Sequence, residues 1–102
     1  MTNIMQTSRV LVWIERGGVP VECADFQAWA EWMACEREHV GDTMVGPARV
    51  STIFMGVGVH GWLYETALFG PGQVGGPVTR YRTRADALIG HGEHVERLKA
   101  ME

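Results

Sequence analysis

The amino-acid sequence predicts an α+β fold, in which a small antiparallel sheet of four to five strands packs with two helices in the order ββαβββα. Three patterns predict it: two apolar strand-like runs within residues 49–70, a glycine pair between two β-branched runs, and two segments with apolar residues at helical spacing. The 102 residues suffice for one globular domain, 1–102, of which residues 1–7 have no pattern and are expected to be frayed.

The first hairpin is expected between residues 10 and 23. β-branched residues occur in VLVWIE before Gly17-Gly18 and in VPVEC after it, and glycine reaches the positive φ that a tight hairpin turn needs. Pro20 has no backbone N–H to donate, which places the second strand at a sheet edge.

A helix is expected over about Phe26 to His39. Asp25 stands where an N-cap residue should, and Gly41 with Asp42 is expected to end the helix. An irregular segment with Gly46-Pro47 should follow. The residues at helical spacing are Phe26, Trp29, Ala30, Met33 and Val40, with Trp32 beside this stripe.

The two central strands, Val50 to Val57 and Trp62 to Phe69, are apolar on both faces. An antiparallel sheet with one solvent-exposed face alternates apolar and polar residues, so both faces of this sheet should be covered. Either the two helices cover opposite faces, or helices cover one face and a partner covers the other, because a large exposed apolar patch usually marks an interface.

The C-terminal part begins with a glycine-rich loop, residues 70–77, and a short strand over Thr79 to Arg82. Thr83 can cap a second helix that runs to about Ala100. The predicted inward stripe of this helix is Leu88, His91, Val95 and Leu98.

Charge and composition disfavour several classes of function. The net charge of -3 gives no general attraction to nucleic acid, so nucleic acid is not expected as a partner. No apolar run approaches the ~18 residues of a membrane span, and the first residues lack the pattern of a signal peptide. We therefore expect a cytoplasmic protein with no membrane partner.

No cofactor or metal site is expected. G-x-G-x-x-G occurs at residues 56–61 and 70–75, but a dinucleotide site needs a helix after the motif, so we interpret both as turn glycines. Cys23 and Cys35 form no CxxC pair and are expected to be core residues. His91 and His94 would need a third metal ligand, Glu65 or His60, and we favour one packed and one exposed histidine.

Glu65 is the most informative single residue, because a carboxylate within an apolar strand must be paired, hydrogen-bonded or protonated. His91 is the predicted partner, with Arg80, Arg82 and Tyr81 as alternatives. A buried Glu and His pair can perform acid–base chemistry near neutral pH. No nucleophile, oxyanion donor or cofactor motif accompanies it, so we favour a buried polar clasp of Glu65, His91 and Tyr81 in a protein that is not an enzyme.

Four aromatic residues are candidates for binding a partner, because Trp and Tyr are favoured anchors of protein interfaces. They are Trp62, Tyr64, Trp13 and Trp32. Trp62, beside a glycine turn, is the one we most expect to be exposed.

The stretches VSTIFMG, LYETALFG and RYRTRADALIGHGEHV, within about Arg49 to Val95, resemble a pattern of small uncharacterised proteins encoded by tailed phages and prophages. The matching positions are Ser51, Thr52, Glu65, Thr66, Tyr81, Gly90 and His91. The chain departs from the pattern in the hairpin turn, where those proteins tend to include an Asp-His pair. The resemblance implies a genomic setting and no established activity.

Three functions are therefore considered. The first is a phage-encoded accessory protein that binds and inhibits or modulates a host protein, with an anti-CRISPR-like inhibitor of host defence among the options. The second is a small enzyme or metal-binding protein centred on Glu65 and His91. The third is a minor virion or assembly component. In each case a homodimer through the second sheet face would cover apolar residues that the helices leave bare.

Overall fold

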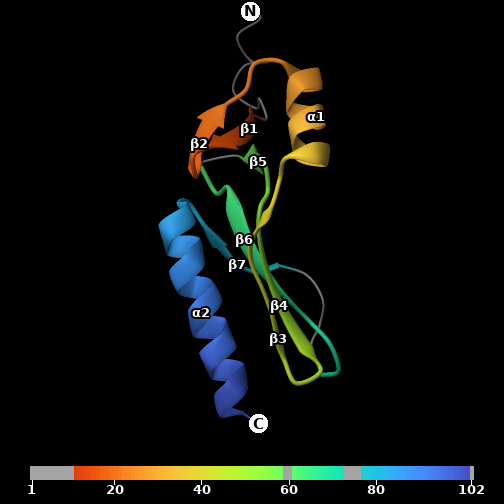
Figure 1. The fold of residues 1–102 in the computed structure, drawn as a ribbon. Helices are drawn as coiled ribbons and strands as arrows, with labels where there is room; N and C mark the ends of the chain where they lie inside the picture. The colour runs from red at the N-terminus through yellow and green to blue at the C-terminus, as the bar shows by residue number, and fades with distance from the viewer. Residues whose placement is uncertain (1–10, 59–60, 73–76, 102) are drawn as a thin grey trace, which may run out of the picture.

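The computed structural model describes residues 11–58, 61–72 and 77–101, and within them the chain forms two helices and two antiparallel sheets (Figure 1). The elements are β1 (Leu11–Arg16), β2 (Val19–Glu22), α1 (Phe26–Cys35), β3 (His39–Val45), β4 (Ala48–Phe54), β5 (Val57–Gly58), β6 (Tyr64–Phe69), β7 (Pro77–Tyr81) and α2 (Arg84–Ala100). The α+β prediction is confirmed, although the strands divide between two sheets. The frayed end expected at residues 1–7, and His60, lie outside the described residues.

The smaller sheet has the strand order β2-β1-β5. Gly17 and Gly18 form the turn between β1 and β2 with φ of 60° and 80°, which confirms the predicted hairpin. Pro20 lies in β2 at the edge of this sheet, as its missing N–H requires. Helix α1 packs against β1, and the Asp25 carboxylate caps its N-terminus by accepting from the amides of Gln27 and Ala28.

Helix α1 ends at Cys35 rather than near His39, and the segment expected to end it forms β3 instead. Gly41 and Asp42 suggest a turn when the sequence is read locally. Pairing with β4 overrides that preference, because Asp42 lies opposite Ser51 in an antiparallel ladder. The observed order of elements therefore has two strands more than the predicted order: β3 before the central pair, and β5 after β4.

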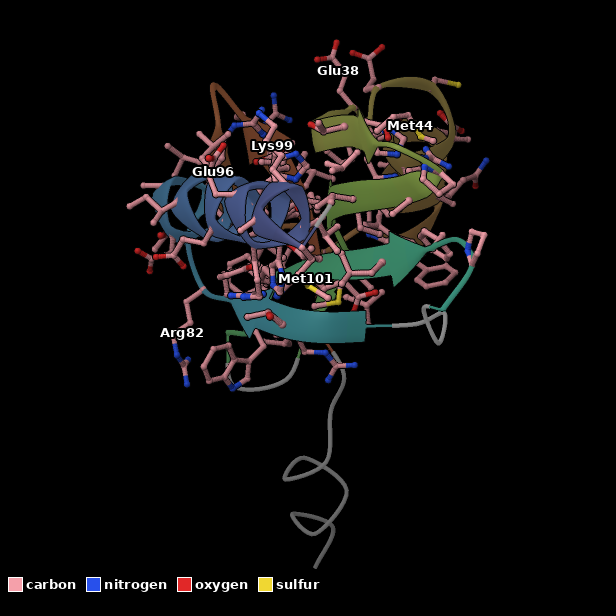
Figure 2. All side chains as sticks on the ribbon, turned by 90° about the horizontal axis from the view of Figure 1, so that it is seen from below. Glu38, Met44, Arg82, Glu96, Lys99 and Met101 are labelled. Carbon is pink, nitrogen blue, oxygen red and sulfur yellow. The ribbon has the colours of Figure 1, made fainter. Side chains whose placement is uncertain are left out.

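The larger sheet has the order β3-β4-β6-β7, and α2 packs against all four of its strands. Thr52 lies opposite Thr66, so the predicted antiparallel pairing of the two central strands is confirmed. Figure 2 shows α2 on one side of the sheet and Met44 towards the other side. No described helix covers that other side, so the two helices do not cover opposite faces of this sheet.

The core consists of two clusters on the α2 side of the larger sheet. One joins both sheets and both helices and contains Phe54, Leu63, Tyr64, Tyr81 and Ala87. The other lies near the far end of α2 and contains Val45, Val50 and Val95.

The buried face of α2 differs from the predicted stripe. Leu88 is 51% exposed, whereas His94 is buried, contrary to the expectation of one packed and one exposed histidine. The helix turns its small residues, Ala87 and Gly90, towards the sheet. A Cβ atom at Gly90 would lie 2.3 Å from the Tyr81 ring, so close approach rather than hydropathy selects this face.

Candidate functional site

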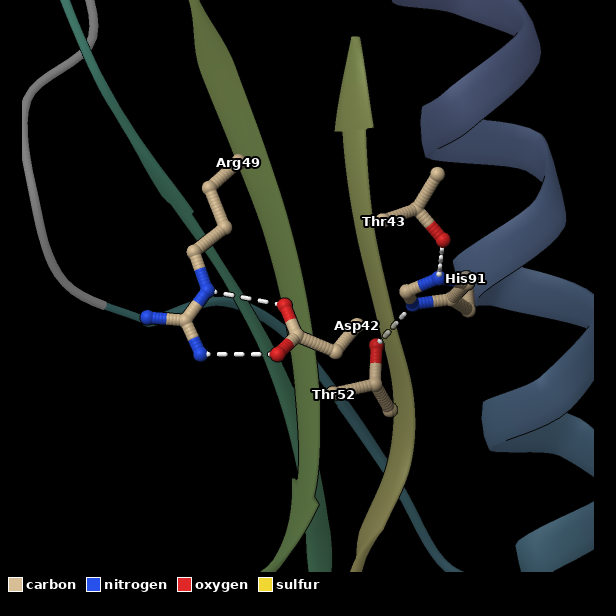
Figure 3. Close-up of polar contacts among 5 residues, drawn as sticks. All are labelled: Asp42, Thr43, Arg49, Thr52 and His91. Carbon is tan, nitrogen blue, oxygen red and sulfur yellow. Dashed lines mark hydrogen bonds and ion pairs between the residues drawn. The ribbon is translucent and has the colours of Figure 1, made fainter.

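A chain of buried side-chain hydrogen bonds links the larger sheet to α2. The hydroxyls of Tyr81 and Thr66 lie 3.1 Å apart, those of Thr66 and Thr52 lie 2.6 Å apart, and Thr52 Oγ1 lies 2.7 Å from His91 Nδ1. His91 Nε2 lies 2.9 Å from the hydroxyl of Thr43 (Figure 3). Both ring nitrogens of His91 are thus occupied by threonine hydroxyls.

The direction of these bonds follows from Tyr81. Within the described part of the chain its hydroxyl has a single hydrogen-bond partner, Thr66, so a satisfied phenol donates to Thr66. Thr66 then donates to Thr52, and Thr52 donates to His91 Nδ1. The proton of the His91 ring therefore lies on Nε2 and is donated to Thr43.

His94 is held in the same tautomer by different neighbours. Arg97 can only donate, so His94 Nδ1 accepts from its guanidinium at 2.8 Å. His94 Nε2 therefore carries the proton and donates to Thr79 Oγ1 at 2.9 Å. Both buried histidines are neutral and serve to position α2.

Burial lowers the pKa of His91 below its usual value of 6.5, and the Asp42 carboxylate opposes this shift. Burial also lowers the pKa of His94, and Arg97 lowers it further. Protonation of either ring would direct a second N–H at a group that already donates to it.

We expect the free energy of unfolding to fall when the pH is lowered from about 7.5 to about 5.5. Below pH 6.5 the unfolded chain binds protons at both histidines while the folded chain resists them, so stability is lost as the pH falls below that value. The loss can reach about 1.4 kcal/mol per pH unit for each histidine. Urea unfolding at the two pH values measures it.

His94→Gln keeps a polar side chain but removes one titrating group, and it should reduce this pH dependence. Equal or greater stability at the lower pH would show that the folded protein accepts both protons readily.

Glu65 lies on the opposite face of the sheet from His91, so the predicted clasp of Glu65, His91 and Tyr81 is wrong in part. Thr66, the next residue along β6, faces α2, and alternation therefore turns Glu65 away from it. Glu65 instead pairs with Arg80 at 3.5 Å, one of the alternatives considered. His91 and Tyr81 do belong to one network, through Thr52 and Thr66.

The four aromatic candidates differ in exposure. Tyr64 is fully buried, so the structure contradicts its use as a partner-binding residue; its ring packs against Phe54 in the core. Trp13 is half-buried against the same core cluster. Trp62 is 40% exposed, but the Arg82 guanidinium lies 4.1 Å from its ring centroid and occupies one face of it.

Trp32 is half-buried and lies between two pockets. Its ring contacts Phe54 edge-on, with centroids 5.6 Å apart, which fixes the indole in place. One pocket of about 440 Å³ is lined on the α1 side by Ala28, Glu31, Trp32, Cys35 and Glu36. The other, of about 450 Å³, is lined by Glu15, Gly17, Gly18, Trp32, Glu36, Glu38 and Arg84. We call Trp32 with these two pockets the Trp32 surface.

The Trp32 surface is electronegative. The C-terminal end of α1 carries a partial negative charge, and its last turn has no basic residue. Glu36 and Glu38 follow, and the exposed Arg37 between them lines neither pocket. Neither carboxylate of these exposed glutamates has a hydrogen bond or ion pair within the described part of the chain. The arginine of the pocket, Arg84, is bound to Glu15 at 3.0 Å and is thereby neutralised.

A second polar cluster, which joins the two sheets, includes Glu15 and Arg84 of the pocket described above. Glu15 on β1 accepts from the Tyr64 hydroxyl at 2.6 Å and from Arg84 at the start of α2. Burial and the hydrogen bond to Glu15 both raise the pKa of Tyr64. The cluster therefore holds β1 against β6 and α2.

Sequence reasoning did not identify Glu15, Glu36, Glu38 or Arg84 as site residues. The acidic end of α1 could have been identified from the sequence, because carboxylates that follow a predicted helix C-terminus interact unfavourably with the helix dipole and so stand out. The Glu15–Arg84 pair is not, because these residues are far apart in the chain and meet only through tertiary packing.

The remaining sequence signals have mixed outcomes: Cys35 is exposed and Cys23 is half-buried, so the expectation that both are core residues is wrong. Gly56 and Gly61 have φ of 73° and 79°, as expected of turn glycines, and Gly56 also admits the Met33 side chain. Within residues 11–58, 61–72 and 77–101 no three His, Cys, Asp or Glu side chains are grouped to hold a metal ion. Neither described helix is long and apolar enough to cross a membrane. No family model, curated protein or solved structure was found to match the chain.

Proposed function

We propose that this is a phage-encoded accessory protein that binds a host protein through the Trp32 surface and thereby inhibits or modulates it, a component of host defence being one such target. The observation that carries the proposal is the half-exposed, immobilised Trp32 between two pockets with acidic rims. The resemblance of residues 49–95 to small tailed-phage proteins supports the phage setting.

Trp32 has the properties of an interface anchor. An indole offers a large contact area, and the Phe54 contact has already restricted its rotation, so little conformational entropy is lost on binding. Residues of this kind account for most of the binding energy in many interfaces. Trp62 is less suited as the main anchor, because Arg82 already stacks on it.

The charge of the surface indicates the chemistry of the partner. Glu31, Glu36 and Glu38 surround the indole, and the α1 C-terminus adds to their negative potential. A lysine or arginine side chain of a partner can enter this potential and contact the indole face as a cation–π pair. We therefore expect a host protein with a basic docking segment.

The arrangement also favours binding over catalysis at Glu65 and His91. These two residues lie on opposite faces of the sheet, and each is engaged by other side chains. A catalytic or metal centre built on the two together has no support in this geometry.

The double substitution Glu36→Lys with Glu38→Lys is expected to weaken partner binding about 10-fold or more, because it reverses the potential that attracts a basic segment. Both side chains are exposed, so the fold should be retained. The measurement is capture of host proteins by the tagged protein, followed by titration of the captured partner.

Glu93→Lys provides the matched control, since Glu93 is exposed on α2, away from the Trp32 surface. It should bind as the unsubstituted protein does. Capture of no partner near one-to-one by the unsubstituted protein would refute the proposed function. Equal binding by the double-lysine variant would refute the Trp32 surface as its site.

A further inference from the structure

We infer that the face of the four-stranded sheet opposite α2 binds a second copy of the chain, giving a two-fold homodimer. We call this the open face. Among the described residues no helix packs on it, and it leaves Met44 61% exposed and Phe69 43% exposed. This surface is distinct from the Trp32 surface, and the inference does not depend on the proposed function.

The strand register arranges the open face in three rows across the sheet. Met44, Arg49 and Phe69 lie opposite one another in the first row. Asp42, Ser51 and Ala67 form the middle row. His39, Ile53, Glu65 and Arg80 form the third row.

Charge favours a second copy as the occupant. The open face has two arginines and two carboxylates, and they pair within the face, Arg49 with Asp42 through two bonds of 2.8 and 2.9 Å and Arg80 with Glu65. Its net charge is therefore zero, and the chain's net charge of -3 is carried by the other residues. Two open faces that meet therefore add no net repulsion of their own, whereas two copies of the acidic Trp32 surface would repel each other.

A two-fold axis parallel to the strands, between β4 and β6, packs each row of one copy on the same row of the other. Arg49 on β4 then lies over Phe69 on β6 of the other copy, where its guanidinium can stack on the ring. The small side chains of Ser51 and Ala67 in the middle row allow the two sheets to approach closely.

The size of the face sets the expected affinity. Four strands at ~4.8 Å spacing, five to seven residues long at ~3.3 Å per residue, give a face of roughly 19 by 20 Å. That is smaller than a standard protein interface and typical of weak association, so we expect a dissociation constant of about 1–100 μM.

Sedimentation equilibrium from about 1 to about 500 μM protein tests this. The average mass should rise from 11.3 kDa towards twice that value. Phe69→Glu and Met44→Glu, each at an exposed position of the open face, should remain monomeric across the range. Ile89→Glu places the same charge at a 62% exposed residue of α2 and should still dimerise.

A monomeric unsubstituted protein at the highest concentration would overturn the inference. Unchanged dimerisation of the Phe69 and Met44 variants would overturn it too, because the contact would then lie elsewhere. Loss of the dimer in the Ile89 variant as well would show a general charge effect and would equally refute this face.

Discussion

Gly90→Ala is expected to lower the free energy of unfolding by about 2–3 kcal/mol, although alanine is a better helix former than glycine by about 1 kcal/mol. An added Cβ atom would lie 2.3 Å from Cε1 and from the hydroxyl oxygen of Tyr81. Tyr81 cannot swing aside cheaply, because it is buried in the core and hydrogen-bonded to Thr66. Either the helix moves away from the sheet or the hydrogen-bonded chain to His91 is broken.

Gly92→Ala is the matched control in the same helix. Apart from its chain neighbours and the backbone of its own helix, no atom lies within 4 Å of the position of its added Cβ, so only the helix propensity changes. This variant should be more stable by about 0.5–1 kcal/mol. Urea unfolding of both variants should give shifts of opposite sign. Stabilisation by both would show that α2 does not need glycine to approach Tyr81.

The same contact explains why the buried face of α2 could not be predicted from hydropathy. Leu88 and Ile89 are apolar but exposed, whereas Gly90 and His91 face the sheet. An apolar stripe predicts a helix face only when large apolar residues fill the interface. Here the strands already supply the Tyr81 ring and the threonine hydroxyls, so the helix must supply space and hydrogen-bonding partners.

Local signals predicted the elements that are stabilised locally. The Gly17-Gly18 turn and the Thr83 cap, which accepts from the Asp86 amide, are set by neighbouring residues, and both are confirmed. Strand β3 has no such signal. Gly41 within it is needed because a Cβ there would lie 2.8 Å from the His91 ring, a residue 50 positions later in the chain.

The candidate site was predictable only in part for the same reason. Trp32 could be chosen from composition and helix spacing. Its value as a binding surface depends on pockets formed by Glu15, the β1–β2 turn and Arg84, which come together from distant parts of the chain. The error at Glu65 arose from assigning its partner on α2, when the strand alternation turns it to the open face.

Glu15→Ala is also expected to have a large effect on stability, and should lower the free energy of unfolding by about 2–4 kcal/mol. The substitution leaves the Tyr64 hydroxyl, in a fully buried residue, without its acceptor. It also leaves Arg84 without its carboxylate partner, although that side chain is 32% exposed and water can solvate part of its charge. Because Glu15 joins the two sheets, the pocket beside Trp32 should open as well.

A double-mutant cycle separates the two contributions. In a Tyr64→Phe background no phenol is left without an acceptor, so Glu15→Ala should cost about 1–2 kcal/mol less than it does alone. Glu22→Ala, at an exposed glutamate on β2, should change stability by no more than about 0.5 kcal/mol. Equal costs of Glu15→Ala in both backgrounds would mean that the bond to Tyr64 contributes nothing to joining the sheets, and that the ion pair with Arg84 alone does so.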